Sequence, residues 1–79
     1  MDRRELKMLL DEEGFNPQRY SLEGGFPDER YCLDQLPDGS WSVYGSERGK
    51  KVAERIFPSE DEACRYLLHL LRRDPSTKR

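Results

Sequence analysis

The chain has 79 residues, of which 34% are hydrophobic and 38% are charged, and its formal net charge is −2 at pH 7. This length predicts a single domain over 1–79, with a core at about 3–73 and a disordered tail at 76–79. Such a core supplies only about 3–5 kcal/mol of net stability, and a catalytic pocket would remove much of it. The composition therefore favours a binding or inhibitory module over an enzyme, without catalytic residues or a small-molecule substrate.

The charge balance and the hydropathy pattern bear on two classes of partner, nucleic acids and membranes. The chain has 14 basic and 16 acidic residues, whereas a general nucleic-acid-binding domain is usually distinctly basic. No apolar run reaches the roughly 18 residues of a membrane span, and the N-terminus lacks the apolar stretch of a signal peptide. We therefore expect a cytoplasmic protein without a membrane partner.

The two cysteines, Cys32 and Cys64, lie far apart in the sequence, and there is one histidine. A zinc site needs about four ligands at characteristic spacings, which are absent here. We interpret both cysteines as small buried hydrophobic residues, with a disulfide as the alternative. The sequence leaves open whether they lie near each other, and it predicts neither a metal nor a cofactor.

The N-terminal part predicts one helix followed by irregular structure. Asp2 and Glu5 form a capping-box pattern that starts a helix at about Arg3, and Gly14 suits the position after its end at Glu13. Three leucines share one face of this helix at helical spacing: Leu6, Leu9 and Leu10. Residues 15–27 are rich in glycine and proline, so we expect a loop with one helical turn at 17–20.

The middle of the chain predicts three strands, at 30–36, 40–44 and 51–57. A Pro-Asp-Gly turn separates the first two, and a polar turn at 46–49 separates the last two. Short links of this kind favour an antiparallel meander. In the second strand, Trp41 and Val43 share one face, which we expect to lie against the helices.

The C-terminal part predicts a second helix up to about Arg73. Ser59 and Glu62 fit a capping box, and the acidic residues between them favour a helix start. The apolar stripe of this helix contains Ala63, Tyr66, Leu67, Leu70 and Leu71. The predicted fold is therefore α+β with αβββα order, a three-stranded antiparallel sheet with two helices packed on one face.

One alternative is a small nucleic-acid-binding module, similar to a double-stranded-RNA-binding domain or an integrase arm. Basic residues gather in and after the second turn, and two aromatic residues nearby could stack on bases. These residues are Arg48, Lys50, Lys51, Arg55, Trp41 and Tyr44. The acidic helix start at 59–62 would repel phosphate, which makes nucleic acid the less favoured partner.

A family resemblance gives the leading hypothesis. Three segments carry it, at 16–33, 41–49 and 57–66, and the most particular pieces are Ser46-Glu47-Arg48-Gly49 and Ser59-Glu60-Asp61-Glu62-Ala63-Cys64. Together they resemble small bacterial immunity proteins of polymorphic-toxin systems, over residues 14–74. One departure from the family pattern is Gly45, where a second tyrosine is expected after Tyr44.

The resemblance implies a non-enzymatic toxin inhibitor that acts by protein–protein interaction with a cognate toxin domain. Tyrosine and arginine are favoured interface anchors, and acidic side chains would speed association with a basic toxin surface. The candidate partner-binding residues are Tyr44, Ser46, Glu47, Arg48, Asp28, Glu29, Asp34 and Trp41. The sequence does not reveal the toxin's activity, the oligomeric state or the contact face.

Overall fold

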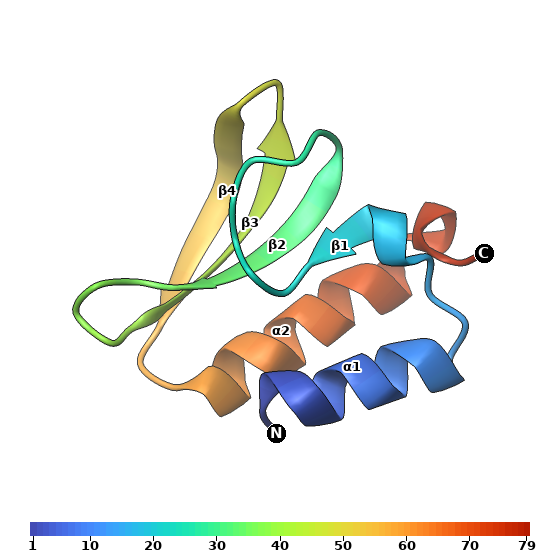
Figure 1. Ribbon diagram of the computed structural model, residues 1–79, viewed down its shortest axis with the longest axis horizontal. Helices are drawn as coiled ribbons and strands as arrows, with labels where there is room; N and C mark the ends of the chain where they lie inside the picture. Colours follow the sequence, from blue (N-terminus) through green and yellow to red (C-terminus); the bar gives the residue numbers. More distant parts are fainter.

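The computed structural model describes residues 1–79 as an α+β fold with two helices beside a four-stranded sheet (Figure 1). The elements in chain order are α1 Arg3–Glu12, the 3-10 helix η1 Pro17–Arg19, β1 Tyr20–Ser21, β2 Arg30–Gln35, β3 Trp41–Glu47, β4 Lys50–Phe57, α2 Glu60–Arg73 and the 3-10 helix η2 Pro75–Thr77. The predicted helices and the three longer strands are confirmed, and so is the helical turn after Pro17.

The sheet differs from the prediction of three antiparallel strands. Its strand order is β1-β2-β3-β4, and β1 pairs with β2 in parallel through Tyr20–Tyr31 and Ser21–Cys32. The pairs β2–β3 and β3–β4 are antiparallel, so the sheet is mixed. A two-residue strand is too short to show the alternating pattern by which strands are recognised, and this is why β1 was missed.

Both helices begin at the predicted capping residues. The Asp2 carboxylate accepts a hydrogen bond from the Glu5 backbone N–H at 2.9 Å, and the Ser59 hydroxyl accepts one from the Glu62 N–H at 3.2 Å. These bonds satisfy backbone donors that have no partner within the helix. Neither α1 nor α2 has the length and apolar character that a membrane crossing requires.

The core lies between the two helices and one face of the sheet. From the sheet come Tyr20, Leu33, Trp41 and Val43, so the predicted orientation of β3 is confirmed. From the helices come Leu6, Leu10, Ala63, Cys64, Leu67, Leu68 and Leu71. The buried face of α2 is broader than the predicted stripe, because α2 packs against both the sheet and α1.

The C-terminal tail is ordered, and the prediction of disorder at 76–79 is wrong. Thr77 is buried, and its hydroxyl donates to the backbone carbonyls of Leu71 and Asp74, each at 2.7 Å. Lys78 forms an isolated β-bridge with Phe15, and the N–H of Arg79 donates to the Gly14 carbonyl at 3.0 Å. These contacts tie the tail to the end of α1, although its composition resembles that of a mobile terminus.

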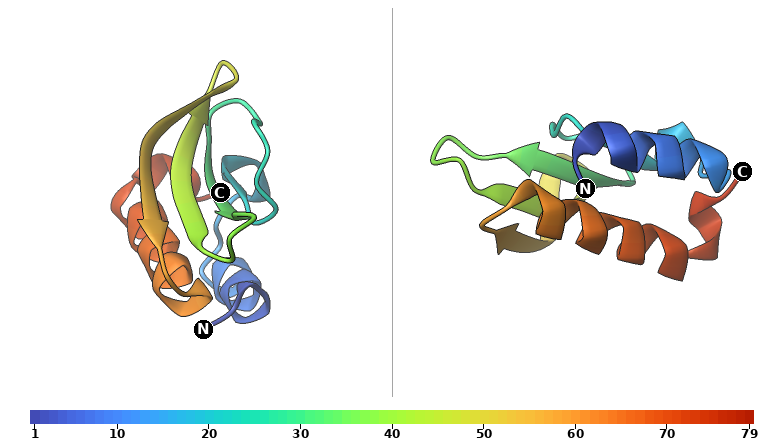
Figure 2. Two further views of the ribbon diagram at one scale, coloured as in Figure 1. Left: turned by 90° about the vertical axis from the view of Figure 1, so that its left-hand side faces the viewer. Right: turned by 90° about the horizontal axis from the view of Figure 1, so that it is seen from below.

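The sheet face opposite α2 is covered by residues 22–29, which we call the covering loop (Figure 2, left). Gly24 approaches β2 so closely that a Cβ atom would lie 2.4 Å from the Asp34 carboxylate carbon. The Tyr44 hydroxyl donates to the Gly25 carbonyl at 2.7 Å. The long connection before β2 is therefore a packed lid over this face of the sheet.

The two cysteines are free and buried, as their interpretation as hydrophobic residues predicts. Cys32 pairs with Tyr44 on the loop-covered face, whereas Cys64 lies in the core between the sheet and the helices. They therefore lie on opposite sides of the sheet, and the alternative of a disulfide between them is wrong.

Candidate functional site

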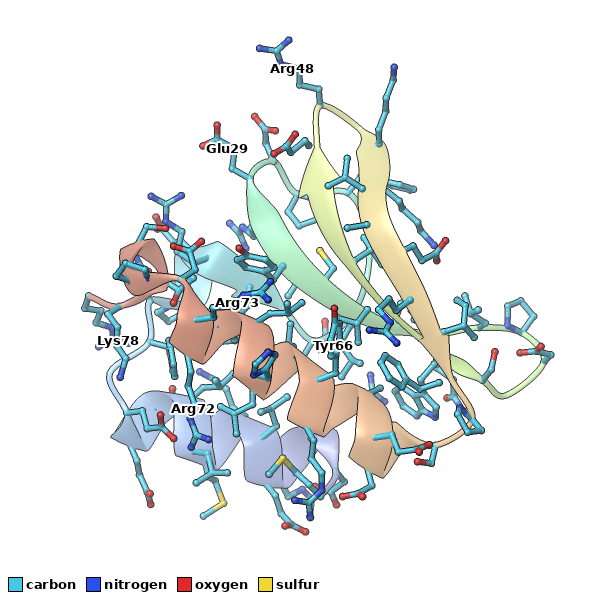
Figure 3. The ribbon with its side chains drawn as sticks, turned by 180° about the vertical axis from the view of Figure 1, so that it is seen from behind. Glu29, Arg48, Tyr66, Arg72, Arg73 and Lys78 are labelled. Carbon is cyan, nitrogen blue, oxygen red and sulfur yellow. The ribbon has the colours of Figure 1, made fainter.

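The β3–β4 hairpin extends beyond the helices and ends at Arg48, whose side chain points into solvent (Figure 3). Because β3 continues to Glu47 and β4 begins at Lys50, Ser46 and Glu47 lie in a strand and not in the predicted turn. The turn consists of Arg48 and Gly49, whose φ angles are 51° and 77°. Two positive φ angles are typical of the tight type I′ hairpin, which prefers Asn-Gly to Arg-Gly.

Asp28 holds this turn from the covering loop. Its carboxylate accepts a hydrogen bond from the Arg48 backbone N–H at 3.0 Å, across a sequence separation of 20 residues. The covering loop therefore stabilises the unusual backbone conformation of Arg48. The bond uses the backbone N–H of Arg48, and its guanidinium group takes no part in it. Asp28, predicted to bind a partner, also has this structural role.

Four of the predicted site residues come together at the end of the hairpin. We call them the hairpin-tip cluster: Asp28, Glu29, Glu47 and Arg48. All four are exposed and line a hollow of about 340 Å³ together with Lys50 and Val52. The chain has six ion pairs within 4.0 Å, and none of them includes a residue of the hairpin-tip cluster.

The other four predicted site residues do not join this surface. Trp41 is only 6% exposed and lies in the core, where the Arg3 guanidinium is 5.2 Å from its ring centroid. Tyr44 is buried beneath the covering loop, and Asp34 is half-buried against Gly24. Ser46 is fully buried within β3.

The burial of Trp41 and Tyr44 also bears on the alternative hypothesis that the chain binds nucleic acid. Neither Trp41 nor Tyr44 presents a ring face for base stacking. The Lys51 ammonium lies 3.2 Å from the Glu54 carboxylate and 4.6 Å from the Tyr44 ring centroid. The Arg55 guanidinium lies over the rings of Phe57 and Tyr66, at 5.9 and 5.1 Å. Of the four basic residues in this region, Arg48 and Lys50 make no such contact.

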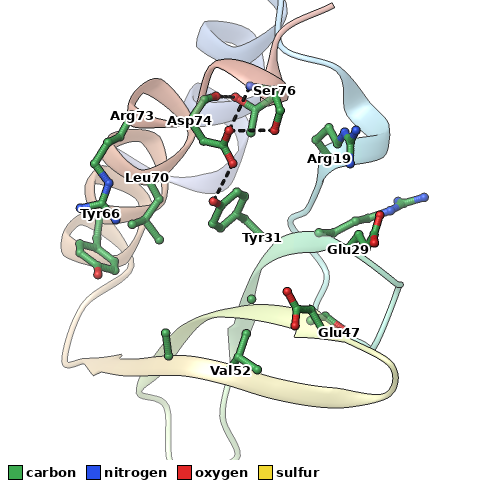
Figure 4. A pocket seen from close by; sticks show the side chains of 15 residues that line it. Arg19, Glu29, Tyr31, Glu47, Val52, Tyr66, Leu70, Arg73, Asp74 and Ser76 are labelled. Atoms are coloured by element: carbon green, nitrogen blue, oxygen red, sulfur yellow. Dashed lines mark hydrogen bonds between the residues drawn. The ribbon is translucent and has the colours of Figure 1, made fainter.

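A groove of about 450 Å³ lies between the hairpin and the C-terminal half of α2 (Figure 4). Gly45 and Val52 line it from the strands, while Tyr66 and Leu70 line it from α2. A Cβ atom at Gly45 would lie 2.9 Å from Val52 Cγ2, so the Val52 side chain packs over this glycine and forms part of the groove surface. No sequence pattern predicts this groove, although Gly45, where the family resemblance leads one to expect a tyrosine, lines it.

One wall of the groove is fixed by a hydrogen bond between Tyr31 and Asp74. The Tyr31 hydroxyl donates to the Asp74 carboxylate at 2.9 Å, and the Ser76 N–H and hydroxyl donate to the same side chain at 3.0 and 2.8 Å. The bonds from Ser76, followed by the bond from Tyr31, lower the pKa of Asp74. Burial, followed by the bond to Asp74, raises the pKa of Tyr31. The ordered tail therefore helps to shape the groove.

Ser46 has a buried hydroxyl group without a hydrogen-bond partner. Its side chain shares the loop-covered face with Ser42, which donates to the Glu54 carboxylate at 2.5 Å. An unsatisfied buried hydroxyl costs about 1–3 kcal/mol. No three His, Cys, Asp or Glu side chains come together in a way that could hold a metal ion.

Comparison of the chain with protein-family models, with curated proteins and with solved structures finds no match in any of the three.

Proposed function

We propose that this chain is a non-enzymatic immunity protein that binds a cognate bacterial toxin domain and blocks its activity in the cytoplasm. The observation that carries the proposal is the hairpin-tip cluster: exposed charged side chains without ion-pair partners, on a hairpin that extends beyond the packed helices. Charges of this kind are free to pair with a partner, and they favour specific and rapid association.

The backbone of the same region supports the proposal. Glu29 and Arg48 have φ angles of 55° and 51°, in the left-handed region that side chains other than glycine and asparagine rarely adopt. Strained positions of this kind concentrate at sites of function, since selection for stability alone would replace them. The sequence Ser-Glu-Arg-Gly, which carries part of the family resemblance, includes this strained arginine.

The chemistry of the buried groups fits a binding protein better than an enzyme. Burial raises the pKa of Cys64 to about 11, so this thiol stays protonated and unreactive at neutral pH. Burial likewise raises the pKa of Tyr44 to about 12, and its hydroxyl is already bonded to a backbone carbonyl. The one histidine, His69, is exposed on α2 and makes no hydrogen bond.

The proposal is tested by expressing the chain together with the toxin domain encoded by the neighbouring gene. We expect co-expression to restore growth, and the two purified proteins to form a complex. The double variant Glu47→Lys/Arg48→Glu should weaken the complex by at least about tenfold, since it reverses two of the exposed charges in the hairpin-tip cluster.

The matched control is Arg4→Glu/Glu12→Lys on α1. It makes the same two charge reversals at exposed positions without ion pairs and leaves the net charge unchanged. This control should bind like the unmodified chain, and both double variants should keep its melting temperature. Growth that is not restored, or salt-sensitive binding to duplex DNA or RNA in the absence of such a toxin gene, would contradict the proposal.

A further inference from the structure

We infer that the groove between the hairpin and α2 receives a short segment of the partner protein in which a basic side chain lies beside a bulky apolar one. The basic side chain would lie between Glu29 and Glu47, and the apolar one would lie against Val52, Tyr66 and Leu70. This inference deepens the proposed function and depends on it for the identity of the partner as a protein.

The apolar part of the groove consists of exposed or half-buried side chains on β4 and α2. Val52 is 39% exposed and lines the groove beside Gly45. Tyr66 and Leu70 line the opposite wall and are only half-buried, although both lie on the apolar stripe of α2. Covering these side chains would remove apolar surface from water, which is favourable by about 25 cal/mol for each Å².

The acidic end of the groove lies where β2 begins and β3 ends. Arg30 pairs with Ser46 at the end of the ladder, and Glu29 and Glu47, the residues next to this pair, both line the groove. Figure 4 shows both carboxylates at the same end of the groove. Like charges at one end of a groove repel each other, and neither carboxylate has a cation within 4.0 Å. A cationic side chain placed between them would relieve this repulsion.

The arginines that line the groove do not supply that cation. Arg30 makes no ion pair with either glutamate within 4.0 Å. Arg73 lies at the α2 wall, near Tyr66 and away from the two glutamates (Figure 4). Arg19 lies nearer Glu29 but makes no ion pair with it within 4.0 Å. The charge pattern therefore favours a basic group in the partner at the sheet end of the groove.

Selection from a phage-displayed library of random linear peptides on the immobilised chain tests the inference without any knowledge of the toxin. We expect the enriched peptides to combine Arg or Lys with a neighbouring Phe, Leu, Ile, Trp or Tyr. Two results would overturn the inference. One is the enrichment of acidic peptides, which would indicate that the arginines of the groove bind the ligand. The other is that no enriched peptide depends on the groove for binding.

Two variants on one strand show whether binding occurs in the groove. Val52→Trp places an indole ring in the groove, while Ile56→Trp places the same ring on the opposite face of the sheet, because Val52 pairs with Gly45 and Ile56 with Ser42. Both positions are exposed, at 39% and 54%, so both variants should fold. We expect Val52→Trp to weaken binding of the selected peptides, and of the toxin domain, by at least about tenfold, and Ile56→Trp to leave binding unchanged. Equal effects of the two variants would overturn the inference.

A second pair of variants tests the acidic end. Glu29→Gln/Glu47→Gln should weaken binding about tenfold and reduce its dependence on salt, whereas Glu12→Gln/Glu23→Gln, at exposed positions outside the groove, should do neither. Sedimentation velocity of the chain alone should show a monomer. A dimer that Val52→Trp dissociates would identify the occupant as a second copy and contradict the inference.

The failures of the two proposals can be told apart. If the toxin domain binds, and the hairpin-tip variant weakens it but Val52→Trp does not, the proposed function stands and the groove inference fails. If no toxin domain binds but the selected peptides respond to Val52→Trp, the groove binds peptides and the proposed function fails.

Discussion

The two halves of β3 differ in how their side chains are packed and hydrogen-bonded, although they belong to one continuous strand. In the first half, Trp41 and Val43 fill the core, and the hydroxyls of Ser42 and Tyr44 are both hydrogen-bonded. In the second half, Gly45 lines the groove, the Ser46 hydroxyl has no partner and Glu47 has no ion pair. The first half is what stability alone would select, whereas the second half departs from local rules as functional sites do.

The largest effect that separates the two halves should come from Trp41. Replacing it with alanine leaves a cavity in the core, and we expect a loss of about 3–5 kcal/mol in the free energy of unfolding. Glu47→Ala, at the other end of the strand, should change this free energy by less than about 0.5 kcal/mol, since its side chain is exposed and unpaired. Urea denaturation measures both, and comparable losses would remove the distinction between the two halves.

The two buried serines should respond with opposite signs. Ser42→Ala removes a hydrogen bond to a carboxylate, so we expect a loss of about 1–2 kcal/mol. Ser46→Ala removes a buried hydroxyl without a partner, so we expect a gain of about 1 kcal/mol. The two substitutions are chemically identical and lie four residues apart on one face of one strand. A loss of stability in Ser46→Ala would show that its hydroxyl has a partner in solution.

The turn at the end of the second half should also be open to stabilisation. Arg48→Asn keeps the backbone N–H that donates to Asp28 and introduces a residue that tolerates the φ angle of 51°. We expect a gain of about 0.5–1 kcal/mol in the free energy of unfolding, measured by thermal denaturation, together with weaker binding of the toxin domain. A variant that is both more stable and fully able to bind would remove Arg48 from the interface.

The smallest effect concerns the dependence of stability on pH in the first half. The hydrogen bond from Ser42, followed by that from Lys51, lowers the pKa of Glu54 in the folded chain. A lowered folded pKa means that this contribution is present above the ordinary glutamate range and is lost as the pH falls through the folded pKa. Unfolding measured at neutral and at acidic pH should therefore show a smaller acid-induced loss in Ser42→Ala than in the unmodified chain. An identical loss in both would contradict this role of Ser42.

The sequence predicted those parts of the fold that depend on residues close together in the chain. The N-caps at Asp2 and Ser59 and the orientation of Trp41 and Val43 are of this kind. The parallel strand β1 and the ordered tail depend on distant partners, such as the bond between the Arg79 N–H and the Gly14 carbonyl. No local pattern encodes such contacts, so sequence reasoning read these segments as loop and disorder.

The candidate site was predicted only in part for the same reason. Asp28, Glu29, Glu47 and Arg48 could be grouped because charged residues near turns are exposed, and the structure brings them together. Tyr44 is buried only because the covering loop folds over it, and the sequence gives no register for that loop. The groove likewise depends on the packing of α2 beside Gly45, which brings together elements far apart in the chain.

The irregularity in β4 has a consequence for how the chain behaves at high concentration. β4 is the open edge of the sheet, and all but the last of its eight residues are exposed. The pairing with β3 shifts between Val43 and Gly45, and opposite this shift Ala53 has a φ angle of 53°. A neighbouring molecule that added a strand to the sheet would therefore meet two short ladders out of line with each other, with two lysines at the start of the strand. Interruptions and charges of this kind discourage edge-to-edge aggregation, so the exposed hairpin need not seed fibres or precipitates.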